Sequence, residues 1–222
     1  MKIILLTLII LIGIGSENKP KKVVPEPKVK NEIIVVERKE TGKKAKSLII
    51  PFNEYQIEFI NSKDNLELME KPEIKNDTLF IFGPDISELK SIRINSSKSD
   101  EFRITQKYES SLILQFDGKA FEMKNWKSYH SEWFDISNGE KIKSYSEKDY
   151  EKFPEYSRKD LLKALEINKK NISEHWYNFV IENLDKKESE VFFEPIINKT
   201  IFKIEIIGKR SIYVELEHMI GC

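Results

Sequence analysis

The stretch LILQFDGKAFEM, residues 112–123, carries a strand pattern on both sides of a central Asp-Gly pair. Its apolar side chains recur at every second position, with Leu112, Leu114 and Phe116 before the pair and Phe121 and Met123 after it. Successive side chains of a strand point to opposite faces of a sheet, so this spacing gives each arm one apolar face. Asp117-Gly118 suits a two-residue turn, because such turns need positive φ at their central residues. The stretch therefore predicts a β-hairpin.

The same two-residue period extends outward from this hairpin. It recurs in YQIEFI at residues 55–60, in SIRIN at 91–95 and in FRITQKY at 102–108. A second candidate turn is Asn138-Gly139 within FDISNGEKI. Residues 79–82 are apolar at every position, which is typical of a strand covered on both faces. Most of the chain before the first helix signal is therefore expected to form strands.

Helix signals replace the alternation in the next part of the chain. Ser146 precedes Asp149, and Ser157 precedes Asp160, at the three-residue spacing of a capping box. Two apolar stripes follow at helical spacing, one at Leu161, Leu162 and Leu165 and the other at Trp176, Phe179, Val180 and Leu184. We expect a helix pair interrupted by NKKNIS at residues 168–173, with one long bent helix as the alternative.

The chain then returns to strands. KTIFKIEII at 199–207 and RSIYVELE at 210–217 alternate around a connection at Gly208, with inward positions at Phe202, Ile204, Ile206, Ile212, Val214 and Leu216. Two strands alone are barely stable in water, so this pair should join the earlier sheet. The predicted fold class is α+β, a mostly antiparallel sheet built from hairpins with a helix pair before a final C-terminal hairpin. Residues 47–222 are expected to form that single domain.

The first fifteen residues have the features of a signal peptide. Lys2 is followed by a twelve-residue apolar run, and Gly13 and Gly15 form a small-x-small cleavage site before Ser16. A fifteen-residue helix covers about 22 Å, less than the roughly 30 Å of a hydrocarbon core, so no transmembrane span is expected after cleavage. A serine stands where a lipoprotein would carry its cysteine. We therefore expect an exported protein, periplasmic or extracellular.

Charge and cysteine content limit the partners. Residues 16–46 are rich in lysine and proline and predict a basic linker, with 10 basic and 5 acidic residues from Glu17 to Lys46. The following body carries 26 basic and 32 acidic residues, which argues against nucleic acid as a partner. Cys222 is the sole cysteine, so an internal disulfide is excluded and a disulfide dimer remains open.

An aromatic segment is the first candidate site. MKNWKSYHSEWF at 123–134 places Trp126, Tyr129 and Trp133 among polar residues. Outside the cytoplasm such aromatic side chains stack on sugars or grip peptides, so we interpret these three as candidate ligand-binding residues for an envelope glycan or peptide. The competing interpretation is that they pack in the core, where tryptophan is mostly found.

The three histidines give a second candidate site. His130 and Glu132 would share a face of a strand, and Asp135 follows closely. With His175 or His218 nearby they would form an acid–base or metal site, but no zinc-binding or nucleophile motif accompanies them, so no metal and no cofactor is expected. The favoured function is a non-enzymatic binding or interaction module of the cell envelope or exterior. The alternatives are an envelope-polymer hydrolase using these residues and a structural protein that dimerises through its C-terminal cysteine.

Overall fold

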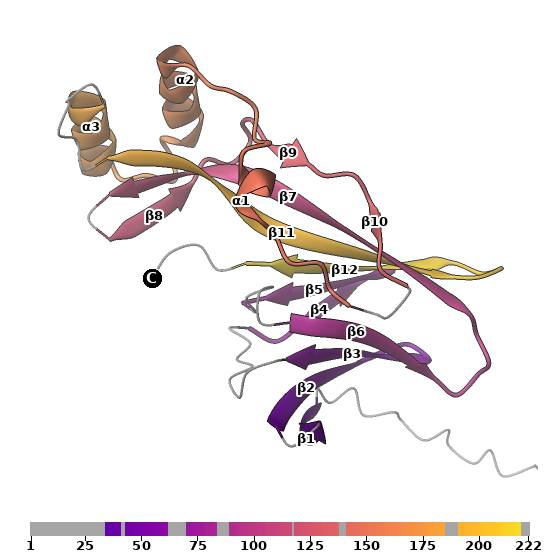
Figure 1. The fold of residues 1–222 in the computed structure, drawn as a ribbon. Coiled ribbons are helices and arrows are strands. Elements are labelled where there is room, and N and C mark those ends of the chain that lie inside the picture. The colour runs from indigo at the N-terminus through magenta and orange to yellow at the C-terminus, as the bar shows by residue number, and fades with distance from the viewer. Residues whose placement is uncertain are drawn as a thin grey trace, which may run out of the picture. The chain divides into compact units, whose positions relative to one another are not determined.

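The computed structural model describes residues 34–40, 43–61, 70–83, 89–116, 118–137, 141–184 and 191–218 (Figure 1). The predicted leader, most of the predicted linker, the Asn138-Gly139 turn, Asp117 and Cys222 lie outside these residues. Within them the fold mixes strands and helices, strands predominate, and their pairing is mostly antiparallel, as the sequence predicts.

Four strands form a first sheet, sheet A, in the antiparallel order β1-β2-β3-β6. They are Ile34–Glu40 (β1), Lys43–Phe52 (β2), Tyr55–Asn61 (β3) and Leu89–Ser96 (β6). Strand pairing therefore begins at Ile34 rather than at Ser47, where the sequence predicts the folded part to start. The β-branched residues Ile34, Val35 and Val36 favour extended backbone, and an edge strand tolerates the charges that follow them.

The remaining strands form a second sheet, sheet B, with the order β10-β7-β11-β12-β5-β4 and with β8 and β9 also paired to β7. They are Glu73–Lys75 (β4), Thr78–Phe82 (β5), Phe102–Phe116 (β7), Lys119–Glu122 (β8), Tyr129–His130 (β9), Phe134–Asp135 (β10), Phe192–Ile206 (β11) and Ser211–Glu217 (β12). Phe116 lies opposite Lys119, which is the register of the predicted two-residue hairpin. The final hairpin joins the earlier sheet as expected, because β11 pairs with β7 along most of its length. The pairing of β12 with β5 is parallel, and the sequence did not indicate it.

Three helices are present in the described residues: Glu147–Tyr150 (α1), Arg158–Asn168 (α2) and Glu174–Asn183 (α3). The two Ser-x-x-Asp signals form capping boxes at the starts of α1 and α2. The helical backbone is interrupted between α2 and α3, within the predicted segment 168–173. The two helices are therefore a pair and not one bent helix. No helix in this part of the chain is long and apolar enough to cross a membrane.

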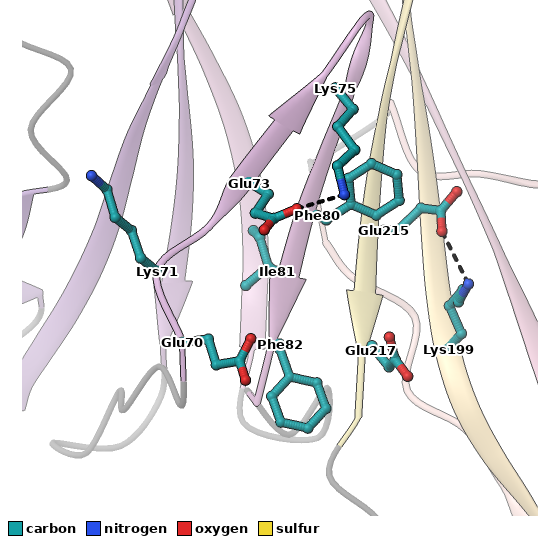
Figure 2. A pocket seen from close by; sticks show the side chains of 10 residues that line it. All are labelled: Glu70, Lys71, Glu73, Lys75, Phe80, Ile81, Phe82, Lys199, Glu215 and Glu217. Carbon is teal, nitrogen blue, oxygen red and sulfur yellow. Dashed lines mark hydrogen bonds and ion pairs between the residues drawn. The ribbon is translucent and has the colours of Figure 1, made fainter.

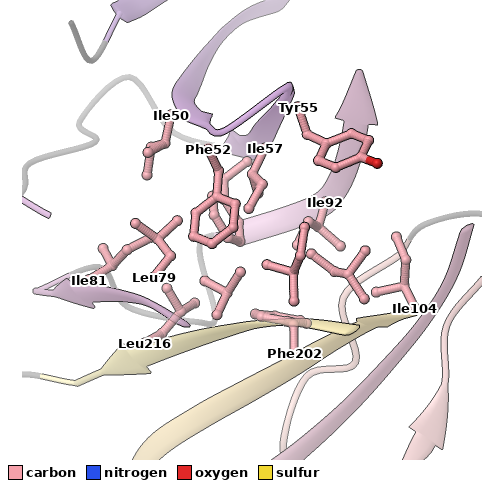
Figure 3. Close-up of a cluster of buried hydrophobic side chains, with 14 of the residues drawn as sticks. Ile50, Phe52, Tyr55, Ile57, Leu79, Ile81, Ile92, Ile104, Phe202 and Leu216 are labelled. Carbon is pink, nitrogen blue, oxygen red and sulfur yellow. The ribbon is translucent and has the colours of Figure 1, made fainter. Parts of the chain in front are cut away.

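Two clusters of buried side chains make the core. The first lies between the sheets, where Phe52 and Ile57 of sheet A meet Leu79 and Phe202 of sheet B (Figure 3). The second lies between sheet B and the helices, where Leu112 and Leu114 meet side chains of α2 and α3. Strands β7 and β11 each run for fifteen residues, and side chains of both strands pack in or against each of the two clusters. The same face of sheet B therefore contributes to both clusters.

The strand β5 differs partly from its prediction. Leu79 and Ile81 are buried in the first cluster, but Phe80 and Phe82 on the other face are only half-buried. The apolar run is thus covered fully on one face alone. Its two phenylalanine rings lie on the face of sheet B that is open to solvent.

Candidate functional site

The open face of sheet B, here called the outer face, is built by alternation along β7. Lys107, Glu109 and Ser111 point to this face, whereas Tyr108 and Leu112 point to the buried face. Oppositely charged side chains alternate across it. Lys107 Nζ lies 3.2 Å from Glu109 Oε1, and Lys199 Nζ lies 3.0 Å from Glu215 Oε2. The outer face therefore carries compensated charge at these pairs, beside the buried apolar side chains of Ile113 and Ile201.

One hollow on this face has a volume of about 380 Å³ (Figure 2). It lies over β4, β5 and β12, and Phe80 and Phe82 form its apolar part. Lys75 pairs with Glu73 at 2.7 Å, and Lys199 with Glu215, as the dashed lines in Figure 2 show. Among its lining residues that the structure describes, no buried side-chain polar atom lacks a hydrogen-bond partner. The lining of this hollow therefore does not favour a particular ligand.

A smaller hollow, of about 190 Å³, lies where β7, β8, β9 and β11 meet. We call it the Asn198 hollow. Its lining residues are Glu109, Ser110, Ser111, Glu122, Met123, Lys124, Asn125, Trp126, Lys127, Ser128, His130 and Asn198. The register between β11 and β7 shifts between Ile197 and Lys199, so Asn198 is the extra residue of a β-bulge. Bulges of this kind redirect a side chain and occur frequently beside functional sites.

Three polar atoms in this hollow are buried without a partner among the described residues. One is the Ser110 hydroxyl, which strand alternation turns away from Ser111, and the other two are on Ser111 and Asn198. Asn198 donates from Nδ2 to Glu122 Oε1 at 2.6 Å, but its Oδ1 has no hydrogen-bond partner among the described residues. The hydroxyl of Ser111 is likewise buried and has none. Such atoms are rare in folded proteins, and leaving one unpaired costs about 1 to 3 kcal/mol. Both atoms would gain from a ligand that hydrogen-bonds to them.

The predicted aromatic residues do not form one surface. Trp126 is half-buried, lines the Asn198 hollow and packs edge-on against Tyr156. Tyr129 packs against Tyr108 on the buried side of the sheet. Trp133 is 41% exposed and does not line the hollow; Lys107 Nζ lies 5.3 Å from its ring centre. Both Trp126 and Tyr129 pack against the second core cluster, as the core-packing interpretation expects, and Trp126 also lines the candidate site.

The predicted histidine site is not assembled. His130 lies opposite Glu109 on β7 and Asp135 lies opposite Thr105, four residues away, or about 13 Å along the strand. Asp135 pairs with Arg103 at 3.1 Å, and Glu132 is exposed. The other two histidines lie elsewhere, since His175 contacts Trp176 on α3 and His218 Nε2 lies 2.8 Å from the Thr200 hydroxyl. Among the described residues no three His, Cys, Asp or Glu side chains are placed to hold a metal ion.

His130 has different partners, which sequence analysis missed. Its Nδ1 lies 3.0 Å from Glu109 Oε1, and its Nε2 lies 3.3 Å from Ser128 Oγ. Burial alone would raise the pKa of Glu109, but the hydrogen bond from Lys107 and the nearby charges of His130 and Lys199 outweigh burial and lower that pKa. The pair of Glu109 and His130 depends on strand register, so no local signal in the sequence could reveal it.

No protein-family model, no curated protein and no solved structure matches this chain. The geometry of the site therefore carries the functional argument by itself.

Proposed function

We propose that the protein is an exported binding module that takes a neutral, hydroxyl-rich ligand, such as one ring of an envelope glycan, in the Asn198 hollow. The observation that carries the proposal is the pair of buried, unpartnered atoms Ser111 Oγ and Asn198 Oδ1. A hydroxyl can donate and accept, whereas an amide oxygen only accepts, so together they match the mixed character of sugar hydroxyls. Trp126 adds an aromatic wall, the usual partner of a sugar face.

The charge and size of the hollow support this ligand class. Its wall carries Glu109 and Glu122 together with Lys124 and Lys127, and this balance does not favour a strongly charged ligand of either sign. Its volume is below the roughly 300 to 1,000 Å³ of a complete small-molecule site, so it suits one ring or end group. Asn198 is followed by Lys199, which lines the larger hollow, so further units of a polymer would extend along the outer face.

Replacing Ser111 by alanine separates binding from folding. The change removes a buried hydroxyl without a partner, so the free energy of unfolding should stay equal or rise. Binding should weaken by about tenfold, or about 1.4 kcal/mol, through loss of one ligand hydrogen bond. Calorimetric titration with N-acetylglucosamine oligomers, neutral glucose oligomers and soluble peptidoglycan fragments measures the affinity, and urea unfolding measures the stability.

Ser47→Ala is the matched control for this experiment. Ser47 also has a buried hydroxyl without a partner among the described residues, but it lies on β2 of sheet A and does not line the Asn198 hollow. Its replacement should leave affinity unchanged. Wild-type affinity in Ser111→Ala, or binding of peptides and none of the sugars, would overturn the proposed site or its ligand class.

Export is the second part of the proposal and rests on the leader at residues 1–15. Signal peptidase would cut after Gly15, because small residues stand three positions and one position before that bond. N-terminal sequencing of the natural product should therefore start at Ser16. A product that begins at Met1 and fractionates with cytosolic proteins would contradict the assigned compartment.

A further inference from the structure

The geometry points to an acyl-transfer centre at the rim of the Asn198 hollow, with Ser128 as nucleophile, His130 as general base and Glu109 as the positioning residue. The substrate class is an O-acyl ester, and the inference rests on the proposed function for the sugar alcohol that carries it. Nothing in the spacing of the sequence indicates this centre, because Glu109 comes from β7 and the other two residues from the segment at β9.

The three side chains form a hydrogen-bonded chain in the order that this chemistry requires. Ser128 lies two residues before His130, next to the two-residue strand β9. Its Oγ lies 3.3 Å from His130 Nε2, and the other ring nitrogen, Nδ1, lies 3.0 Å from Glu109 Oε1. In serine hydrolases the catalytic serine likewise contacts Nε2 of the histidine and the carboxylate contacts Nδ1. That arrangement is recognised by its geometry and not by the order of the residues in the sequence.

Glu109 fixes the proton positions along this chain. Lys107 Nζ contacts the same carboxylate at 3.2 Å, and Lys199 adds positive charge nearby, so Glu109 stays ionised near neutral pH. An ionised carboxylate only accepts hydrogen bonds, so it holds the imidazole proton on Nδ1. His130 Nε2 is then left bare to accept the proton of Ser128. The carboxylate itself neither gains nor loses a proton.

The centre is open to a substrate held by the proposed binding residues. Glu109, Ser128 and His130 all line the hollow that contains Ser111, Trp126 and Asn198. The His130 side chain is 54% exposed and Ser128 is exposed, so an ester can approach from solvent. Lys124 and Asn125 line the same wall and offer an ammonium group and an amide for the developing oxyanion.

The reaction balances with water as the only co-reactant. Ser128 Oγ attacks the ester carbonyl carbon, its proton passes to His130 Nε2, and the carbon–oxygen bond to the sugar breaks as Nε2 returns the proton to the leaving alcohol. Water then attacks the acyl-serine, again losing its proton to Nε2, and Ser128 leaves with that proton. The net change is ester plus water to carboxylic acid plus alcohol.

The test uses the full mature chain with p-nitrophenyl acetate as substrate and a fluorophosphonate as covalent probe. Mass spectrometry should locate the phosphonyl group on Ser128, and Ser128→Ala should lower the hydrolysis rate constant at least 100-fold. His130→Asn should lower it by a similar factor. Ser144→Ala is the control, because Ser144 is also exposed but lies outside the hollow.

Glu109→Gln tests the positioning role, because the tautomer of His130 is a readout that a change in protein stability alone would not alter. The amide should change the tautomer of His130, which nitrogen-15 NMR of the imidazole reports, and should lower the rate about tenfold or more. Phosphonylation of Ser128 no faster than of Ser144, or wild-type hydrolysis by Ser128→Ala, would show that these hydrogen bonds only hold β9 in place. The two proposals fail separately in the wild-type protein: sugar binding without phosphonylation of Ser128 would contradict only this centre, and phosphonylation of Ser128 without sugar binding would contradict only the proposed ligand.

Discussion

Phe202→Ala is expected to destabilise the protein by about 4 kcal/mol, a large part of the 5 to 15 kcal/mol that holds a typical domain folded. Phe202 is fully buried between the two sheets (Figure 3). Its ring centre lies 5.9 Å from that of Phe59. Alanine would lose the transfer free energy of the ring and leave a cavity that two sheets held by many strands cannot close. Urea unfolding followed by tryptophan fluorescence measures the change.

The same strand offers a matched control. Phe192 begins β11 and is 58% exposed, so Phe192→Ala should change the free energy of unfolding by about 0.5 kcal/mol or less. Equal effects of the two substitutions would mean that the sheets do not pack through Phe202. An effect of Phe202→Ala below about 1 kcal/mol would have the same meaning.

Asp149→Asn should cost about 2 to 3 kcal/mol at neutral pH. The Asp149 side chain is only 7% exposed and accepts hydrogen bonds from Tyr108 Oη at 2.9 Å, the Ser146 backbone at 3.0 Å and Lys152 Nζ at 2.9 Å. Burial alone would raise its pKa, but these donors outweigh burial and hold the pKa well below the usual range. An asparagine amide cannot satisfy the same donors, because one end of it is itself a donor.

The pH dependence of this loss has a definite sign. A carboxyl whose pKa is depressed in the folded state stabilises the fold fully above its unfolded pKa, which is about 3.9. That stabilisation is lost as the pH falls below this value towards the folded pKa. The difference in unfolding free energy between wild type and Asp149→Asn should therefore be constant from pH 6 to 8 and should shrink below about pH 4.

Asp160 gives the control for this prediction, because it occupies the same capping-box position at the start of α2. Its hydrogen bonds with Ser157 lower its pKa to about 2, but the side chain is far more exposed than that of Asp149. Asp160→Asn should shift the urea midpoint much less than Asp149→Asn. A similar shift from both variants would show that capping alone, and not the buried contact with Tyr108, accounts for the effect.

The sequence predicts those parts of the fold that local chemistry determines. Asp117-Gly118 between alternating arms predicts the hairpin of β7 and β8, and serine three residues before aspartate predicts the starts of α1 and α2. The full length of β7 was not predicted, because Glu109, Ser110 and Ser111 interrupt its apolar alternation. Those three residues are buried or half-buried because β9 and β11 pair with β7 at this point. That pairing exists only in the folded chain, so the local sequence does not indicate their burial.

The candidate site was less predictable than the fold for the same reason. The aromatic segment overlaps the hollow that we propose as the site, since Trp126, Ser128 and His130 all line it. Which aromatic side chain reaches the outer face depends on the register of β9, and Asn198 matters only because a bulge redirects it. Glu109 and Asn198 are ordinary residues in the sequence and become special through strands that are distant along the chain.

The parallel pairing of β5 with β12 determines when the protein can finish folding. Residues 78–82 find their partner only at residues 213–217, so this contact closes a loop of most of the domain. Contacts of such long sequence separation make folding slow, typically milliseconds to seconds. During synthesis, Leu79 and Ile81 must wait until residues 213–217 have left the ribosome before both edges of β5 are paired, so sheet B stays incomplete until that point.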